Sequence, residues 1–371
     1  MKVAVRYFSG TGNTARACSL VGEEFRAALW DVDLRELRTG QDTEYEGIEG
    51  ADLLFLAFPV LGFAPPTVVR QWLARFPKTY KKPAAVLCIG GASFVKSVYV
   101  PGWGGDAPFQ AARILVRRAC TIAGIAEVSY PENWIQISAP PDEEKSDAIR
   151  TLNDPAVRIY AQSVIAHAMG KAEVPNLNRR RLTMLVMGFI SFLFAVYGKK
   201  LLGRIFLADD SCTSCGLCAR ACPASAIKMK RGRPVWGSRC IACNRCINLC
   251  PSRSIVTSNI LLAAHLFIFI AFFALAISFP LPAELIMPAR GALRIAAFLV
   301  LALVQFWPVT AALRALSKTK PLRKAFSVSF MSGFPRYLAP GFGLGGKNAV
   351  PVADAGPSRS KRLRGINRKN A

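Results

Sequence analysis

The sequence has few histidines and shows no secretory signal at its start. Only His167 and His265 occur among its 371 residues. Multi-haem cytochromes and histidine-rich metal sites need more imidazoles, which argues against both classes. The first residues lack an apolar core followed by a small-residue cleavage site, so we expect the N-terminal half to stay in the cytosol.

Charge is scarce and unevenly distributed. Charged residues make up 19% of the chain and apolar residues 52%, whereas soluble chains usually hold about 25% charged residues. Residues 1–172 contain 19 basic and 18 acidic side chains, but residues 173–371 contain 29 basic and 5 acidic ones. A neutral, soluble first half followed by a basic, membrane-attached half is therefore predicted. Nucleic acid is not an expected partner, because the positive charge flanks hydrophobic runs and is not interleaved with exposed aromatics.

Short buried runs alternate with longer amphipathic stretches through residues 1–172. The expected strands are 2–8, 30–37, 51–58, 84–90 and 125–130, and the expected helices are 13–29, 67–76, 109–123 and 155–170. Runs such as 53–58 are apolar on both faces, as a parallel sheet covered on both sides requires. This alternation predicts a doubly wound α/β fold with a parallel sheet.

A loop rich in glycine and hydroxyl groups follows the first expected strand. It reads Ser9-Gly10-Thr11-Gly12-Asn13-Thr14. Here the first helix should begin, and a helix N-terminus offers unpaired N–H groups and partial positive charge to a phosphate. Neutral donors of this kind can hold a monophosphate without a lysine or arginine.

Two other interpretations of this loop remain open. Gly10-x-Gly12-x-x-Ala15 also matches the dinucleotide fingerprint, with Asp31 and Asp33 about 20 residues further on. A glycine-rich turn without a ligand is the second alternative. The Walker-type phosphate loop is excluded, because no Gly-Lys-Ser/Thr follows.

Three loops of this half resemble those of flavodoxins. Residues 9–14 resemble the flavodoxin loop that binds the phosphate of FMN. Residues 57–66 resemble the second loop, which flanks the flavin ring, and residues 89–92 resemble the start of the third. The resemblance implies FMN as cofactor and adds six further contact residues, namely Pro59, Val60, Leu61, Gly62, Gly90 and Gly91. Leu61 stands where flavodoxins usually place an aromatic ring, so stacking is expected from Phe63, Tyr99, Trp103 or Trp134 instead.

Eight of the eleven cysteines form two runs of the same spacing, each ending in Cys-Pro. The runs are Cys212, Cys215, Cys218 and Cys222, then Cys240, Cys243, Cys246 and Cys250. This C-x₂-C-x₂-C-x₃-C-P spacing binds iron–sulfur clusters in bacterial proteins. In a cytosolic setting such dense cysteines indicate metal ligands and not disulfides. Structural zinc is the alternative, but zinc usually takes two C-x₂-C pairs separated by a longer loop.

The duplicated runs resemble bacterial two-cluster ferredoxins. In that pattern the fourth cysteine of each run serves the other cluster. One [4Fe–4S] cluster is thus expected on Cys212, Cys215, Cys218 and Cys250, and the second on Cys240, Cys243, Cys246 and Cys222. The resemblance also implies that the segments 226–229 and 254–257 pair with each other as strands over the clusters.

Two uncharged runs, 260–279 and 295–313, are long enough to cross a bilayer as a transmembrane α-helical hairpin. Basic residues outnumber acidic ones by 11 to 2 in residues 199–257 and by 13 to 1 after residue 313. Because positive flanks stay inside, the flavin and cluster units are expected on the cytoplasmic side of a bacterial inner membrane. The uncharged run 182–198 would be a short span. An interfacial or re-entrant helix, or one packed beneath the cysteine-rich segment, is preferred for it.

The expected organisation has five parts. These are a flavodoxin-like FMN domain (1–172), a linker (173–208) whose apolar run 182–198 is an interfacial or membrane helix, a small α+β dicluster ferredoxin-like domain (209–257), a segment with the two transmembrane helices 260–279 and 295–313 (258–316), and a basic, largely disordered tail (317–371). This order resembles bacterial flavodoxin–ferredoxin fusion proteins.

The resemblance implies a membrane-anchored electron-transfer protein with unidentified protein donor and acceptor. No constellation of general acid, base or nucleophile accompanies the cofactor motifs. The alternatives are an oxidoreductase that reduces a membrane quinone, and a non-enzymatic iron–sulfur redox sensor.

Overall fold

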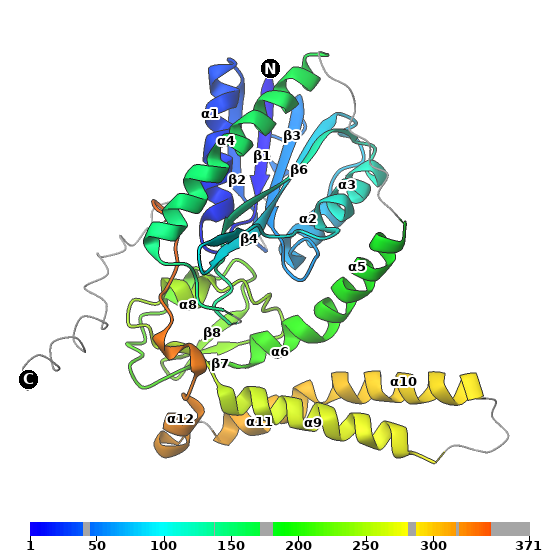
Figure 1. Ribbon diagram of the computed structural model, residues 1–371, viewed down its shortest axis with the longest axis vertical. Coiled ribbons are helices and arrows are strands. Elements are labelled where there is room, and N and C mark those ends of the chain that lie inside the picture. Colours follow the sequence, from blue (N-terminus) through cyan, green and yellow to red (C-terminus); the bar gives the residue numbers. More distant parts are fainter. Residues whose placement is uncertain (40–44, 137, 171–180, 281–286, 317–318, 343–371) are drawn as a thin grey trace, which may run out of the picture.

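The computed structural model describes residues 1–39, 45–136, 138–170, 181–280, 287–316 and 319–342. Its N-terminal unit is a parallel sheet in the order β2-β1-β3-β4-β6. The strands are β1 (Lys2–Tyr7), β2 (Asp31–Glu36), β3 (Leu53–Pro59), β4 (Pro83–Val95) and β6 (Thr121–Pro131), and the short β5 (Val98–Val100) pairs antiparallel with the end of β4. The predicted doubly wound α/β fold is confirmed (Figure 1).

Helices cover both faces of this sheet. The helices are α1 (Asn13–Ala27), α2 (Thr67–Arg75), α3 (Ala107–Arg117) and α4 (Glu143–Ala168). Alternate residues of β3 serve the two sides: Leu54 and Leu56 join the core under α2 and α3, whereas Phe55 joins the core under α1 and α4. A strand buried on both faces explains the continuous apolar run seen in the sequence.

The last helix of this unit begins earlier than the sequence pattern indicated. A start at Pro155 was expected, but α4 begins at Glu143 and contains Pro155 in its interior. The carboxylate of Asp142 caps the helix by accepting a hydrogen bond from the backbone N–H of Lys145. The N-cap and the acidic first turn therefore determine the start of the helix.

The cysteine-rich unit lies at the carboxyl end of the parallel sheet (Figure 1). It comprises β7 (Phe206–Ala208), α7 (Leu217–Arg220), β8 (Ile227–Lys230), β9 (Arg233–Trp236), α8 (Arg245–Leu249) and β10 (Ile255–Thr257). The expected pairing between 226–229 and 254–257 is wrong, since β8 pairs with β9 and β10 pairs with β7. Arg231 and Gly232 both have positive φ, which makes a tight hairpin between β8 and β9 and gives β8 a local partner.

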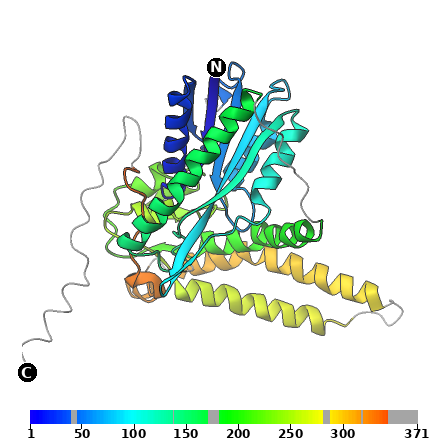
Figure 2. The same cartoon turned by 45° about the horizontal axis from the view of Figure 1, so that its top comes forward.

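Three apolar helical stretches are long enough to cross a membrane, at residues 186–204, 259–278 and 287–313. The first comprises α5 (Arg181–Leu193), the π-helical η2 (Phe194–Gly198) and α6 (Lys199–Arg204); the others are α9 (Asn259–Ser278), α10 (Met287–Val304) and α11 (Phe306–Leu316). The helix that contains the run 182–198 is therefore longer than the run itself, because the helix continues through Lys199 and Lys200 to Arg204. α9 and α10 lie side by side away from the sheet (Figure 2).

The chain folds again after the hairpin. It forms α12 (Lys320–Phe326) and the 3₁₀ turn η3 (Phe330–Gly333), then runs back to the N-terminal unit. Met331, Tyr337 and Ala339 are buried, so the disorder expected for residues 317–371 does not extend to 319–342. The rest of the expected disordered tail lies outside the described residues.

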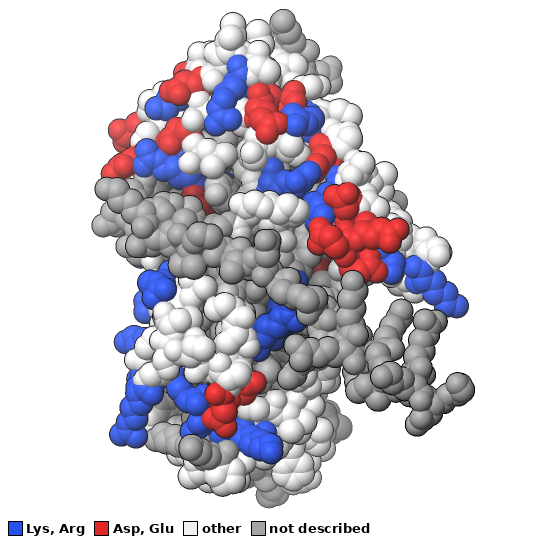
Figure 3. All heavy atoms as spheres, turned by 90° about the vertical axis from the view of Figure 1, so that its left-hand side faces the viewer, with Lys and Arg blue, Asp and Glu red and all other residues white. Residues whose placement is uncertain are grey.

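The charge asymmetry of the sequence is visible on one face of the molecule (Figure 3). Acidic and basic side chains mix over the N-terminal unit, whereas basic side chains dominate over the cysteine-rich unit below it. The two folded units therefore keep the distinct charge character of the two halves of the sequence.

An ion pair between neighbouring strands, which joins the buried Arg6 to the half-buried Asp33, is expected to make the N-terminal unit acid-sensitive. Burial raises the pKa of Asp33, but hydrogen bonds from Arg35 and Arg6 outweigh it and hold the pKa below its usual value. This stabilisation is present above the unfolded pKa of about 3.9 and is lost as the pH falls through the lower folded pKa. We expect Asp33→Asn to flatten the acid limb of thermal stability between about pH 5 and 2, measured by circular dichroism. An unchanged acid limb would contradict this assignment, and Asp31→Asn, at an exposed carboxylate, serves as control.

Candidate functional site

The loop 9–14 connects β1 to the N-terminus of α1 at the carboxyl edge of the sheet. Ser9, Thr11, Asn13 and Thr14 are buried there. Ser9 Oγ accepts a hydrogen bond from the Gly12 N–H at 3.1 Å, and Asn13 Nδ2 donates to the Pro131 carbonyl at 2.8 Å. These bonds fix the curvature of the loop.

Two hydroxyl groups of this loop are buried without a hydrogen-bond partner. They are the Oγ1 atoms of Thr11 and Thr14. A buried hydroxyl that makes no hydrogen bond costs about 1–3 kcal/mol, so such a group calls for a partner such as a bound ion, a water molecule or a ligand. Together with the N–H groups at the start of α1, they fit a phosphate, since both supply donors to an anion.

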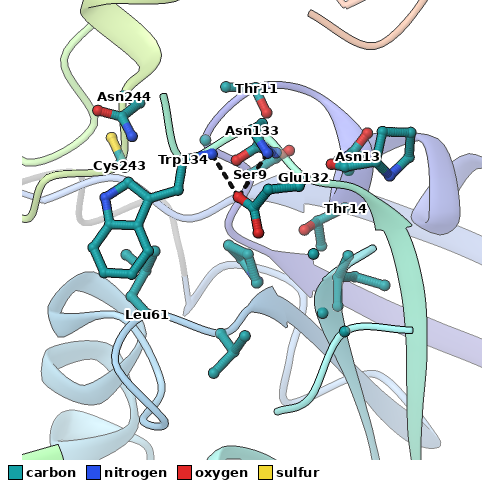
Figure 4. A pocket seen from close by; sticks show the side chains of 18 of the residues that line it. Ser9, Thr11, Asn13, Thr14, Leu61, Glu132, Asn133, Trp134, Cys243 and Asn244 are labelled. Carbon is teal, nitrogen blue, oxygen red and sulfur yellow. Dashed lines mark hydrogen bonds between the residues drawn. The ribbon is translucent and has the colours of Figure 1, made fainter. Parts of the chain in front are cut away.

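The loop forms one wall of a cavity of about 390 Å³ (Figure 4). This volume lies within the range of small-molecule pockets, about 300–1,000 Å³. Eleven of the twelve residues expected to contact the flavin line it: Ser9, Gly10, Thr11, Asn13, Thr14, Pro59, Val60, Leu61, Gly62, Gly90 and Gly91. Gly12 is the exception, because it faces the C-terminal segment.

Aromatic side chains flank the cavity, as a planar ring requires. Phe63, Trp103 and Trp134 line it, but Tyr99 does not. In Figure 4 the indole of Trp134 lies above Leu61. Trp134 packs edge-to-face on Phe194 of η2, with ring centroids 5.5 Å apart, so the apolar helix supports this wall.

Glu132 supplies a carboxylate to the cavity, and the sequence reasoning missed it. Its Oε1 accepts hydrogen bonds from the backbone N–H groups of Asn133 and Trp134 at 2.8 and 2.6 Å. Glu132 follows the end of β6 directly, where ligands bind in such sheets. Its position after that strand was the available signal.

The structure gathers the eight cysteines of the two runs into two groups of four thiols. Cys212, Cys215, Cys218 and Cys250 line one small cavity. In the second group, Cys222, Cys240 and Cys243 lie close enough to the buried Cys246 to interact with it electrostatically. Burial raises the pKa of Cys218 and of Cys243 to about 11. Such thiols need a nearby cation to ionise, and bound iron would supply it.

The thiol groups surround a space and not a point. Within the described ranges, no three or more His, Cys, Asp or Glu side chains converge closely enough for a single metal ion. The donor set of four thiols around a cavity fits a polynuclear iron–sulfur cluster.

The second cysteine group borders the same cavity as the loop 9–14. Ala242, Cys243 and Asn244 line this cavity together with the loop of β1. A Cβ added to Gly10 would lie 2.7 Å from the Cys243 carbonyl oxygen. A glycine is thus required at position 10 for the two units to approach this closely.

Arg245 fastens the two units at the same point. Its side chain is buried and pairs with Glu36. Its guanidinium donates to the carbonyls of Ser9 and Gly10, the second at 3.1 Å, and to the Ala221 carbonyl at 3.3 Å. Ser9 and Gly10 belong to the predicted phosphate loop, and Ala221 directly precedes Cys222 of the first cysteine run.

The C-terminal segment 334–342 forms a strap over the loop of β1. The Ala339 N–H donates to the Thr11 carbonyl at 2.8 Å, and Tyr337 Oη donates to Asn13 Oδ1 at 2.5 Å. Gly12, at φ +106°, faces the strap, and a Cβ there would lie 2.6 Å from Phe342. The strap therefore closes the loop from outside.

A family model for the 4Fe-4S dicluster domain matches residues 211–255, which contain all eight cysteines of the two runs. Residues 211–255 form a 4Fe-4S dicluster domain. No curated protein matches the sequence. The match confirms the predicted ferredoxin-like domain and its iron–sulfur character.

Several solved structures are similar to the N-terminal unit. A flavodoxin from the domain Archaea shares 15% identity with a TM-score of 0.30, covering 44% of this chain and 99% of its own. Flavodoxin 1 from Bacillus cereus shares 15% with a TM-score of 0.31, covering 45% and 99%. Rubredoxin oxygen:oxidoreductase from Desulfovibrio gigas shares 16% with a TM-score of 0.29, covering 45% and 36%. The flavodoxin-like fold itself rests on the strand order β2-β1-β3-β4-β6.

Replacement of Gly12 tests whether the strapped loop binds FMN. Gly12→Ala introduces a strained φ at a cost of about 1–3 kcal/mol and pushes against Phe342. We expect FMN to bind at least about tenfold more weakly, measured by quenching of flavin fluorescence. Gly50→Ala, where a Cβ meets nothing within 4 Å, should bind like the wild type. Equal affinity in both variants would contradict the assignment.

Proposed function

We propose that this protein is a membrane-anchored iron–sulfur flavoprotein that relays electrons between two [4Fe–4S] clusters, FMN and a redox partner. Ser9 to Thr14 would hold the phosphate of FMN, and residues 59–62, 90 and 91 would flank its ring. Cys212, Cys215, Cys218 and Cys250 would hold one cluster, and Cys222, Cys240, Cys243 and Cys246 the other. The clusters carry single electrons and FMN carries one or two, so the pair joins one- and two-electron partners.

The observation that carries this proposal is the shared wall between the two cofactor sites. Cys243 belongs to the second cysteine group and lines the same cavity as the loop 9–14. Arg245 keeps the wall closed through its bonds to Ser9 and Gly10. A structural cluster with no electron traffic would not require this contact.

The domains are proposed to be those expected from the sequence: 1–172 for FMN, 173–208 as linker, 209–257 for the clusters, 258–316 as membrane hairpin and 317–371 as tail. The hairpin is proposed to span a bacterial inner membrane with both cofactor units in the cytoplasm, because basic residues dominate both of its flanks.

The apolar helix 186–204 is proposed to lie at the membrane surface. Its Ser191 Oγ donates to the Phe63 carbonyl at 2.9 Å, and Lys199 Nζ donates to Thr67 Oγ1 at 3.1 Å. Because residues 191–199 of this helix pack on residues 63–67 of the N-terminal unit, lipid cannot surround this part of the helix. Its exposed Phe189 and Phe192 are then available to the lipid.

The test is a reductive titration of detergent-purified protein with anaerobically rebuilt clusters. About eight iron and eight sulfide per FMN are expected, with flavin and cluster spectra changing together as electrons equilibrate. Clusters without flavin would overturn the relay and leave a membrane-tethered ferredoxin. Irreversible cluster loss on reduction and reoxidation would favour the redox sensor.

Arg245 offers a sharper test of the contact between the sites. Arg245→Lys keeps the positive charge but loses the planar fork that bonds several acceptors at once. We expect internal electron equilibration, followed by stopped-flow absorbance, to slow at least about tenfold, with iron content preserved. Arg239→Lys is the matched control on the exposed side of the same domain. Equal rates in both variants would contradict a role for the contact.

A further inference from the structure

Four polar side chains gather where the apolar hairpin meets the cysteine-rich unit. They are Arg204 of α6, His265 of α9, Gln305 between α10 and α11, and Thr310 of α11, and are called the polar cluster below. His265 and Gln305 are each 2% exposed, and Thr310 is 8% exposed. Buried polar groups among membrane-type helices are expensive and usually functional.

The polar cluster is arranged around the ring of Phe306. The Arg204 guanidinium lies 4.9 Å from the centre of this ring, and its Nε donates to the Phe306 carbonyl at 3.1 Å. The imidazole of His265 lies 5.6 Å from the same ring and its Nε2 is 3.5 Å from Thr310 Oγ1. Polar groups from three helices thus meet at one place.

The helix is irregular at one residue here, Gln305, although the Gln305 N–H still donates to the Leu301 carbonyl and the Val309 N–H to the Gln305 carbonyl. α10 ends at Val304 and α11 begins at Phe306, because Pro308 has no N–H to donate to the Val304 carbonyl. The side-chain oxygen of Gln305 is buried there without a hydrogen-bond partner. In membrane helices, an irregularity of this kind at a proline is tolerated where neighbouring helices, side chains or water satisfy the backbone carbonyl that the proline leaves without a donor.

The polar cluster is also next to the second cysteine group. A Cβ added to Gly203 would lie 3.2 Å from Cys240 Sγ. Gly203 directly precedes Arg204 in the chain. The Cys240 thiol of the second cysteine group is therefore next to the residue that precedes the polar cluster. An electron acceptor held at the polar cluster would therefore be adjacent to the second iron–sulfur site.

We propose that the polar cluster binds the head group of a lipid-soluble quinone, a step that rests on the relay proposed above. A quinone needs an apolar surrounding for its ring and tail, and donors for its carbonyl oxygens. Arg204 supplies such donors, and the Gln305 oxygen accepts from a hydroxyl of the quinol. His265, 5.6 Å from the Phe306 ring, and Thr310, 3.5 Å from His265 Nε2, add two further polar groups beside it.

The redox step balances with the electrons that the relay supplies. The quinone gains two electrons, delivered one at a time from the reduced iron–sulfur site, and two protons from water to become the quinol. The iron–sulfur site is oxidised and is reduced again by a low-potential one-electron donor, for which reduced methyl viologen serves in the assay.

Binding is tested without electron transfer by photolabelling the detergent-purified full chain with a short-chain azidoquinone. Label is expected on peptides that contain Arg204, His265 or Gln305, and unlabelled quinone should compete for it. Gln305→Leu should reduce this label at least tenfold, whereas Ser278→Ala, at the far end of α9, should not. Label spread evenly along the hairpin, or insensitive to competitor, would overturn the site.

Turnover is tested in liposomes that contain a long-chain quinone and the rebuilt protein. Quinol formation should fall at least tenfold in Gln305→Leu and in His265→Leu, with iron and FMN content and their mutual equilibration unchanged. Equal rates in the variants would overturn the proposal. Failure of the relay is distinguishable, because it appears in the titration before quinone is added and leaves the photolabelling unaffected.

Discussion

The arrangement of both cofactor sites depends on one buried guanidinium. Arg245 belongs to the dicluster domain, but its partners Ser9, Gly10 and Glu36 belong to the flavodoxin-like unit. Separation of the units would break all of these bonds at once, and removal of Glu36 alone would leave the Arg245 charge buried without its carboxylate partner, at a cost of about 3–5 kcal/mol. The two domains are therefore held together as one body, and the distance between the cavity beside the loop 9–14 and the second cysteine group is set by the fold.

The membrane part is tied to the same place from the other side. The chain leaves the dicluster domain through α9, returns through α10 and α11, and ends its described course as the strap over Thr11 and Asn13. The apolar helix before the domain supports the opposite wall through Phe194 and Trp134. Both contacts are made by segments that also border the hairpin, so the cavity beside the loop 9–14 is held between elements that are continuous with the apolar helices.

Sequence reasoning reached the features that depend on local spacing. The loop 9–14, the cysteine runs and the apolar spans are each readable from neighbouring residues, and the alternation of elements was enough for the sheet. It missed what depends on distant contacts. Tyr337 meets Asn13 across 324 positions, and Arg245 meets Glu36 across 209. No periodicity or motif marks such pairs, and the strand pairing of β8 failed because a two-residue turn supplied a nearer partner.

The helix irregularity at Gln305 could be predicted only in part from the sequence. Pro308 is visible in the sequence and predicts an interrupted helix, yet an uncharged run around it still reads as one continuous span. Only the packing of α6 and α9 against this irregularity brings Arg204 and His265 to Phe306. A proline in a span is therefore ambiguous by itself. When buried polar groups from other helices converge near it, as Arg204 and His265 converge on Phe306, the packing of the folded chain and not the proline alone supports a binding site there.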